Sequence, residues 1–209
     1  MDTEQPPVVT EPPKSSGDFD SSDFVNSYVA TIKKVLTEPR DFFAALPTNA
    51  GYGAPLIYLL PAAAISGFLS ALVGPGQSGG AAFAALILAP IAAIIGSFIG
   101  AALLHASSYI FAEKAKGGYE GTWRVVAYSY GSIAWITWIP VIGFLGSLYA
   151  IYVTIMGIEG VHGTSTSKAA TAVLVLVGIA ILLGIILAAI LAFVVGASLL
   201  GSGAFPFRP

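Results

Sequence analysis

Charge is scarce in this sequence. Only 10% of its 209 residues are charged, whereas 56% are hydrophobic, and soluble domains carry about 25% charged residues. The acidic residues are also segregated, because eight of eleven precede residue 42 and none lies between Phe42 and Ala112. A chain with so few polar groups cannot cover a water-soluble surface, so it is predicted to be a membrane protein that has the lipid bilayer as its first partner.

Other absences exclude whole classes of function. The chain has no cysteine, which excludes disulfides, thiolate catalysis and cysteine metal sites. No serine stands with a histidine at matched depth in the predicted spans, so no enzymatic activity is expected. The net charge of -2 is too small to indicate nucleic acid as a partner. No cofactor is expected.

The region before the first apolar run has two parts. Residues 1–22 are acidic and rich in proline and serine, so they are expected to form a disordered tail. In residues 23–47, apolar side chains recur at helical spacing and Lys33 and Lys34 lie toward the other face. This pattern predicts an amphipathic cytoplasmic segment lying on the headgroups. Two interpretations stay open: it packs beneath the membrane domain, or it docks a partner protein.

Long apolar runs fill residues 54–200. A helix of about 20 residues crosses a hydrocarbon core of about 30 Å, and the run from Val125 to Ile158 is too long for one crossing. Pro140 divides it into two short spans, with a re-entrant hairpin as the alternative. The prediction is an all-α polytopic membrane protein of about five transmembrane helices, preceded by the amphipathic interfacial helix. The predicted spans are 55–73, 81–111, 124–139, 141–158 and 169–198, followed by a C-terminal tail at 201–209.

Lysine and arginine indicate the orientation. With five spans, one side of the membrane receives seven of these residues near the span ends and the opposite side receives only Arg208. Loops rich in lysine and arginine stay in the cytoplasm. The N-terminus is therefore expected to be cytoplasmic and the C-terminus outside, in the cell (inner) membrane.

Three segments resemble those of a known family. Residues 36–46 contain Pro-x-x-Phe-Phe, residues 117–129 begin with Gly-Gly-x-x-x-Thr-Trp, and residues 157–169 join the last two spans. In their order and spacing they are similar to the Yip (Ypt/Rab-interacting protein) domain family, which implies five helices and a cytoplasmic N-terminus. The Asp-Leu-Tyr-Gly-Pro segment of eukaryotic members is missing, so the chain resembles the prokaryotic branch, and Rab binding is not carried over.

Few ionisable side chains remain as candidate site residues. His105 is in the second span, near Glu113, while Glu159 and His162 stand three apart at the end of the fourth. They could form a structural polar cluster at the helix ends, handle protons, or ligate a metal ion. Nothing in their spacing brings them together, so the structural cluster is favoured and no metal site is assigned.

Small residues spaced by four predict close helix packing. The two sets are Ala63, Gly67 and Ala71 in the first span and Ala92, Gly96 and Gly100 in the second. They could pack within the chain or form a homo- or hetero-oligomer contact.

The favoured function is a non-enzymatic adaptor, assembly or membrane-organisation protein that binds protein partners at its cytoplasmic face. An accessory subunit of a larger membrane complex and a small channel or transporter are the alternatives. In the last case, Ser129, Ser132 and Thr137 would line the pathway.

Overall fold

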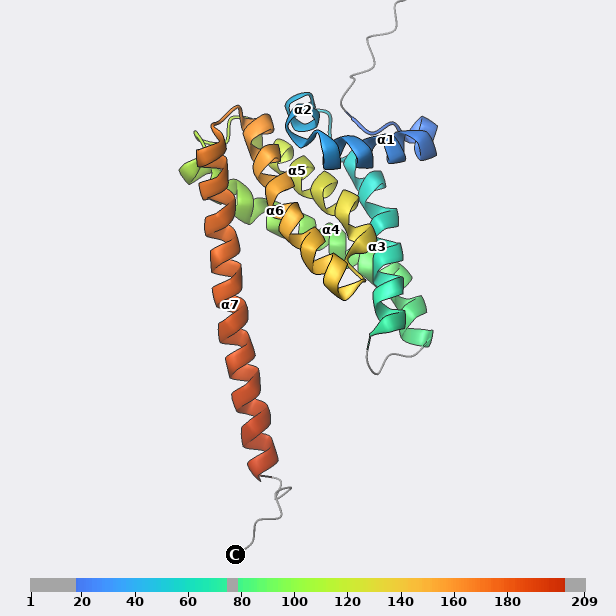
Figure 1. Ribbon diagram of the computed structural model, residues 1–209, viewed down its shortest axis with the longest axis vertical. Helices are drawn as coiled ribbons and strands as arrows, with labels where there is room; N and C mark the ends of the chain where they lie inside the picture. Colours follow the sequence, from blue (N-terminus) through green and yellow to red (C-terminus); the bar gives the residue numbers. More distant parts are fainter. Residues whose placement is uncertain (1–17, 75–78, 202–209) are drawn as a thin grey trace, which may run out of the picture.

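A computed structural model describes residues 18–74 and 79–201, without the side chains of 199–201 (Figure 1). Residues 1–17 and 202–209 of the two expected tails, and residues 75–78 between the first two predicted spans, lie outside this part. Its secondary structure is helical: η1 (Ser21–Asp23), α1 (Phe24–Thr37), α2 (Pro39–Ala44), α3 (Gly53–Val73), α4 (Gly79–Phe111), α5 (Gly118–Ile133), η2 (Ala134–Ile136), α6 (Pro140–His162) and α7 (Thr166–Gly201).

Four of these helices, α3, α4, α6 and α7, are long and apolar enough to cross a membrane within the described residues. The prediction of an all-α polytopic membrane protein is therefore confirmed. Pro61 and Pro90 both lie inside helices, which membrane helices tolerate because neighbouring groups satisfy the freed carbonyls.

The helix α5 differs from these four. It has 16 residues, of which eleven are buried, and it carries Glu120 and Arg124. By length and polarity it does not qualify as a candidate span, although the sequence placed a span at 124–139. Hydroxyl pairs attach it and η2 to α3: Tyr58 with Ser132 at 2.6 Å, and Ser66 with Thr137 at 2.9 Å. Two of the hydroxyls considered as pathway-lining groups therefore join helices.

The chain reverses direction after η2. The extended residue Ile139 ends the first half and Pro140 begins α6, because the residue before proline resists the helical region while proline fits the first helical position. The apolar region 124–158 thus forms two helices.

The amphipathic segment lies across one end of the bundle (Figure 1). On α1, Tyr28, Thr31 and Val35 are buried, whereas Val25 and Val29 on another face are 70% and 61% exposed. The following helix α2 buries Phe42 and Phe43 against α6. Proline at position 39 separates the two helices.

The last helix, α7, is packed along only part of its length. Its 36 residues extend about 54 Å at 1.5 Å per residue. Ala169, Ala172 and Val173 are buried, but every residue from 178 to 195 is exposed. Figure 1 shows this second half running alone beyond the end of α6.

Candidate functional site

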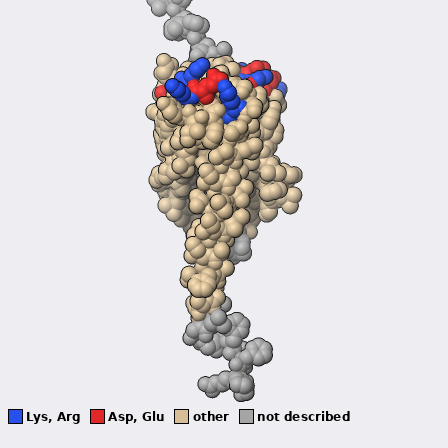
Figure 2. Space-filling view, turned by 90° about the vertical axis from the view of Figure 1, so that its left-hand side faces the viewer, with Lys and Arg blue, Asp and Glu red and all other residues tan. Residues whose placement is uncertain are grey.

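The charged side chains gather at one end of the molecule, here called the charged end. Figure 2 shows lysine, arginine, aspartate and glutamate together at the top of the face in view, above a surface without charge. This end is built by η1, α1 and α2, by the start of α5, and by the connections α4–α5 and α6–α7. This end offers charged side chains for polar contacts or chemistry.

Arg124 lies at the centre of this end, with its side chain fully buried. Its Nη1 donates to Asp18 Oδ2 at 2.8 Å, its Nε donates to Glu120 Oε1 at 3.2 Å, and its Nη2 donates to the carbonyl of Gly51. Each carboxylate partner is less than a fifth exposed. A buried charge is tolerated only when it is paired and hydrogen-bonded, and Arg124 meets both conditions.

Gly51 completes the Arg124 site with its backbone. Its N–H donates to Glu120 Oε1 at 2.8 Å while its carbonyl accepts from Arg124. The peptide unit takes up this position with φ at +82°, a left-handed conformation that favours glycine. The connection before α3 is thereby attached to α5.

Asp18 and Phe19 pack against the bundle. The other carboxylate oxygen of Asp18 accepts from the Tyr128 hydroxyl, and the Phe19 ring is only 3% exposed, between Tyr28 and Tyr58. The sequence places residues 18–22 in the expected tail, whereas Asp18 and Phe19 contact α5 and α3 here. An ion pair and a buried ring outweigh the entropy cost that composition suggested.

His105 and His162 are joined through Thr122. The Gly117 N–H donates to His162 Nδ1 at 3.0 Å, so the proton of this ring is on Nε2, which donates to Thr122 Oγ1 at 3.0 Å. Thr122 Oγ1 is also 2.9 Å from His105 Nδ1 and 3.3 Å from the Gly118 carbonyl, so its hydroxyl proton serves one of these two contacts. This chain of hydrogen bonds connects α4, α5 and α6 and uses both nitrogens of His162.

Glu159 is only 6% exposed and faces α2 and α7. It forms an ion pair with Arg40 and accepts from the Thr166 hydroxyl at 2.9 Å. Both oxygens have partners, so this carboxylate joins the amphipathic segment to the α6–α7 connection.

Glu113 lies at the surface, between two lysines. Lys168 Nζ is 2.8 Å from one carboxylate oxygen and Lys116 Nζ is 3.4 Å from the other. The hydrogen bond from Lys168, followed by the charge of Lys168, holds the pKa of Glu113 below its ordinary value. Glu113 thus connects the α4–α5 loop with the start of α7.

The four polar candidates from the sequence therefore form three separate contacts. The structure brings His105 and His162 together, with ring centroids 6.2 Å apart, but gives Glu159 and Glu113 cationic partners elsewhere. Within residues 18–74 and 79–201, no three His, Asp or Glu side chains are close enough to hold a metal ion. The arrangement is suited to fixing helices relative to one another.

Glycines allow the helices to approach closely at the same place. A Cβ on Gly160 would lie 2.8 Å from the backbone nitrogen of Ala44, and one on Gly157 would lie 2.5 Å from Val125. On α5, a Cβ on Gly121 would lie 2.5 Å from Val161. Real Cβ atoms do not come this close, so α2, α5 and α6 meet here only because these positions are glycine.

The two sets of small residues have different surroundings. In α3, Ala63 is 1% exposed and a Cβ on Gly67 would lie 2.2 Å from Ala89 Cβ, so this set packs on α4; Ala71 is half-buried. In α4, no atom would lie within 4 Å of a Cβ on Gly96 or Gly100, and Ala92 is exposed. The second set faces open space.

Sequence reasoning missed Arg124, Asp18 and Thr122, which hold the charged end together. One signal was available: Glu120 and Arg124 are four apart, as ion-paired residues on a helix are. No local pattern could have paired Asp18 with a residue 106 positions later.

The chain is similar to a known protein family. The family model described as the Yip1 domain matches residues 33–190. No curated protein and no solved structure matches the chain. The matched range contains the three glycine- and aromatic-rich segments, and these are the segments that meet at the charged end.

Proposed function

Since the chain belongs to the Yip1 domain family, whose model covers most of its length, we propose that it is a non-enzymatic adaptor or assembly protein that binds other proteins at its charged end. The family is one of membrane proteins without enzymatic activity, which supports this choice. The proposal also includes orientation: the charged end faces the cytoplasm of the inner membrane, and the C-terminus lies outside.

The observation that carries the proposal is a difference between two sets of polar groups at the charged end: one set is buried and the other faces outward. Arg124, His162 and Glu159 are buried and use their polar atoms on other parts of the same chain. The outward side chains include Arg40, Lys116 and Lys168, which are 62%, 68% and 52% exposed. A surface of mixed charge on a rigid support suits a protein partner, because charged rims steer association and fix its register.

The charge of α2 provides the test. Glu38 and Asp41 are exposed, so reversing their charge leaves the packed side of α2 in place. We expect Glu38→Lys with Asp41→Lys to lose the proteins that copurify with the wild type in mild detergent. The control Glu38→Asp with Asp41→Glu keeps the charge and should retain them. Recovery of the same proteins with the reversed variant, measured by quantitative mass spectrometry, would contradict the proposal.

Orientation can be tested separately because the parent chain has no cysteine. Lys116→Cys lies at the charged end and Val73→Cys at the far end of α3. An impermeant maleimide should label Val73→Cys in intact cells and Lys116→Cys only after lysis. The reverse pattern would show that the charged end faces outward.

A further inference from the structure

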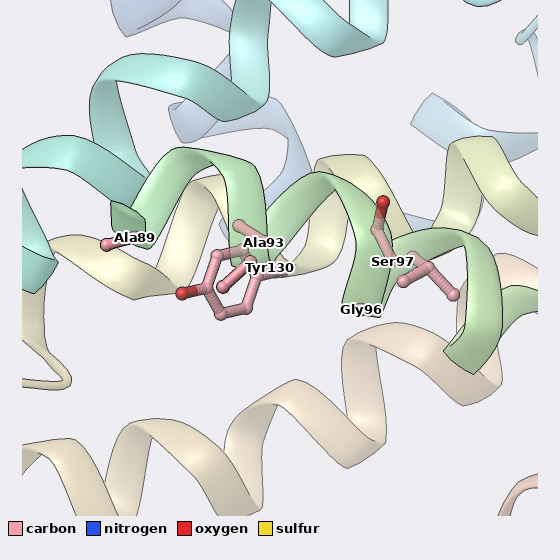
Figure 3. Close-up of a pocket in the computed structure, with 7 residues that line it drawn as sticks. Ala89, Ala93, Gly96, Ser97 and Tyr130 are labelled. Atoms are coloured by element: carbon pink, nitrogen blue, oxygen red, sulfur yellow. The ribbon is translucent and has the colours of Figure 1, made fainter. Parts of the chain in front are cut away.

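A groove opens along α4, over α5 and, toward one end, beside α6 and α7. Its deeper part is a cavity of about 440 Å³, shown in Figure 3 with small residues of α4 along one side and Tyr130 of α5 across it. A second cavity of about 260 Å³ shares Val126 with the first and is lined by α4, α5, α6 and α7. Together they extend along α4 from Ala89 to Leu104.

The groove contains no charged side chain. Its α4 wall belongs to a helix long and apolar enough to cross a membrane, so hydrocarbon is the medium at its mouth. Protein interiors are close-packed and seldom leave apolar voids of this size empty. An occupant must therefore be apolar and must enter sideways from the bilayer.

The shape of the groove selects among apolar occupants. Toward the charged end, α7 closes it: the Ser107 hydroxyl donates to the Ala172 carbonyl at 2.7 Å, and Val173, Leu176 and Val177 line the last part. A partner helix about 10 Å across could not end there, because its terminal N–H and C=O groups would be left unpaired in hydrocarbon. A hydrocarbon chain ends in a methyl group and has no such groups.

Length and polarity agree with a chain of this kind. From Ala89 to Leu104 α4 rises about 22 Å at 1.5 Å per residue, which is comparable with an extended acyl chain. Tyr130 lies at the end away from α7, near Ala89 (Figure 3). Its hydroxyl has no hydrogen-bond partner among the described residues and can donate to an ester carbonyl.

We propose that this groove binds one acyl chain of a membrane phospholipid, with its methyl end under α7 and its ester near Tyr130. The exposed small residues of α4 then have a specific role. They provide the depth of the groove, since nothing lies within 4 Å of a Cβ built on Gly96 or Gly100. The lipid belongs to the leaflet opposite the charged end.

Native mass spectrometry of the full chain, released from detergent that strips loosely held lipid, tests the proposal. We expect one phospholipid to stay on the wild type, and Gly96→Leu to lower the lipid-bound fraction by about tenfold by filling the groove. The control Gly184→Leu makes the same change on α7, at another glycine with nothing within 4 Å, and should keep the lipid. Tyr130→Phe should lower the fraction by a smaller factor.

Three outcomes would overturn the assignment. They are a wild type that retains no lipid, a Gly96→Leu variant that retains it at the wild-type level, and equal loss in Gly96→Leu and Gly184→Leu. Photo-crosslinking from a benzophenone amino acid at position 130 gives an independent check. A crosslink to lipid supports the proposal, whereas a crosslink to a second copy or to another protein would assign the groove to a helix instead.

Discussion

The two ends of this molecule are stabilised in different ways. At the charged end Arg124 and Thr122 are fully buried, both have hydrogen-bond partners from other elements, and glycines bring backbones together. At the other end the side chains are apolar and exposed, as with Phe193 of α7 at 77%, and contacts with lipid replace contacts with protein. The charged end therefore fixes the arrangement of the helices, while the distal end has the apolar surface that contact with lipid requires.

Removing the buried cation should have the largest effect. In Arg124→Met the partly buried carboxylates of Asp18 and Glu120 lose their cationic partner, so we expect a loss of about 3–5 kcal/mol of unfolding free energy. Unfolding in mixed micelles measures it. Replacing all three residues, as Asp18→Asn, Glu120→Gln and Arg124→Met, should restore part of the loss; no restoration would show that Arg124 acts through packing alone.

A second prediction applies one substitution to both ends. Gly160→Ala places a Cβ 2.8 Å from the backbone of α2 and should cost about 1–3 kcal/mol through overpacking. Gly178→Ala on α7 meets nothing within 4 Å and should stabilise the helix by about 0.5–1 kcal/mol. Thermal unfolding in detergent compares the two variants. A change in stability of the same sign in both would contradict the difference between the ends.

The histidines should differ from each other. His162→Ala leaves the Gly117 N–H without a partner in a buried site and removes one of the hydrogen bonds of Thr122, so we expect a loss of about 1–2 kcal/mol. His105→Ala removes one hydrogen bond from a half-buried ring and should cost less, about 0.5–1.5 kcal/mol. Equal losses in the same unfolding assay would mean that the chain through Thr122 does not stabilise the helix ends.

The smallest effect is expected at Glu113. Because Lys168 lowers the pKa of this exposed carboxylate, its contribution to stability is present above the unfolded-state pKa and is lost as the pH falls through the folded-state pKa. Glu113→Gln should therefore lower stability slightly at neutral pH and leave it unchanged in acid. High salt should reduce the difference, and a difference that persists in acid would indicate another cause.

The sequence predicted the general architecture but not the internal contacts. Hydropathy identified the apolar helices because each helix that contacts lipid must itself be apolar. Pro140 marked the start of α6. It did not reveal that α5 is enclosed by protein, since Glu120 and Arg124 at its start resemble an aqueous loop. The histidines were found as candidates, but their partner Thr122 was not, because a hydroxyl on a helix has no pattern that indicates its contacts.

The composition of α5 has a consequence for biogenesis. A helix of 16 residues with a glutamate and an arginine inserts poorly into a bilayer by itself, because charged groups are costly there. Its carboxylate partner Asp18 is synthesised 106 residues before Arg124 and must remain available until that arginine emerges from the ribosome. Insertion of α5 therefore depends on α3 and α4 being in place. The earliest described residues of the chain are then among the last to form their native contacts.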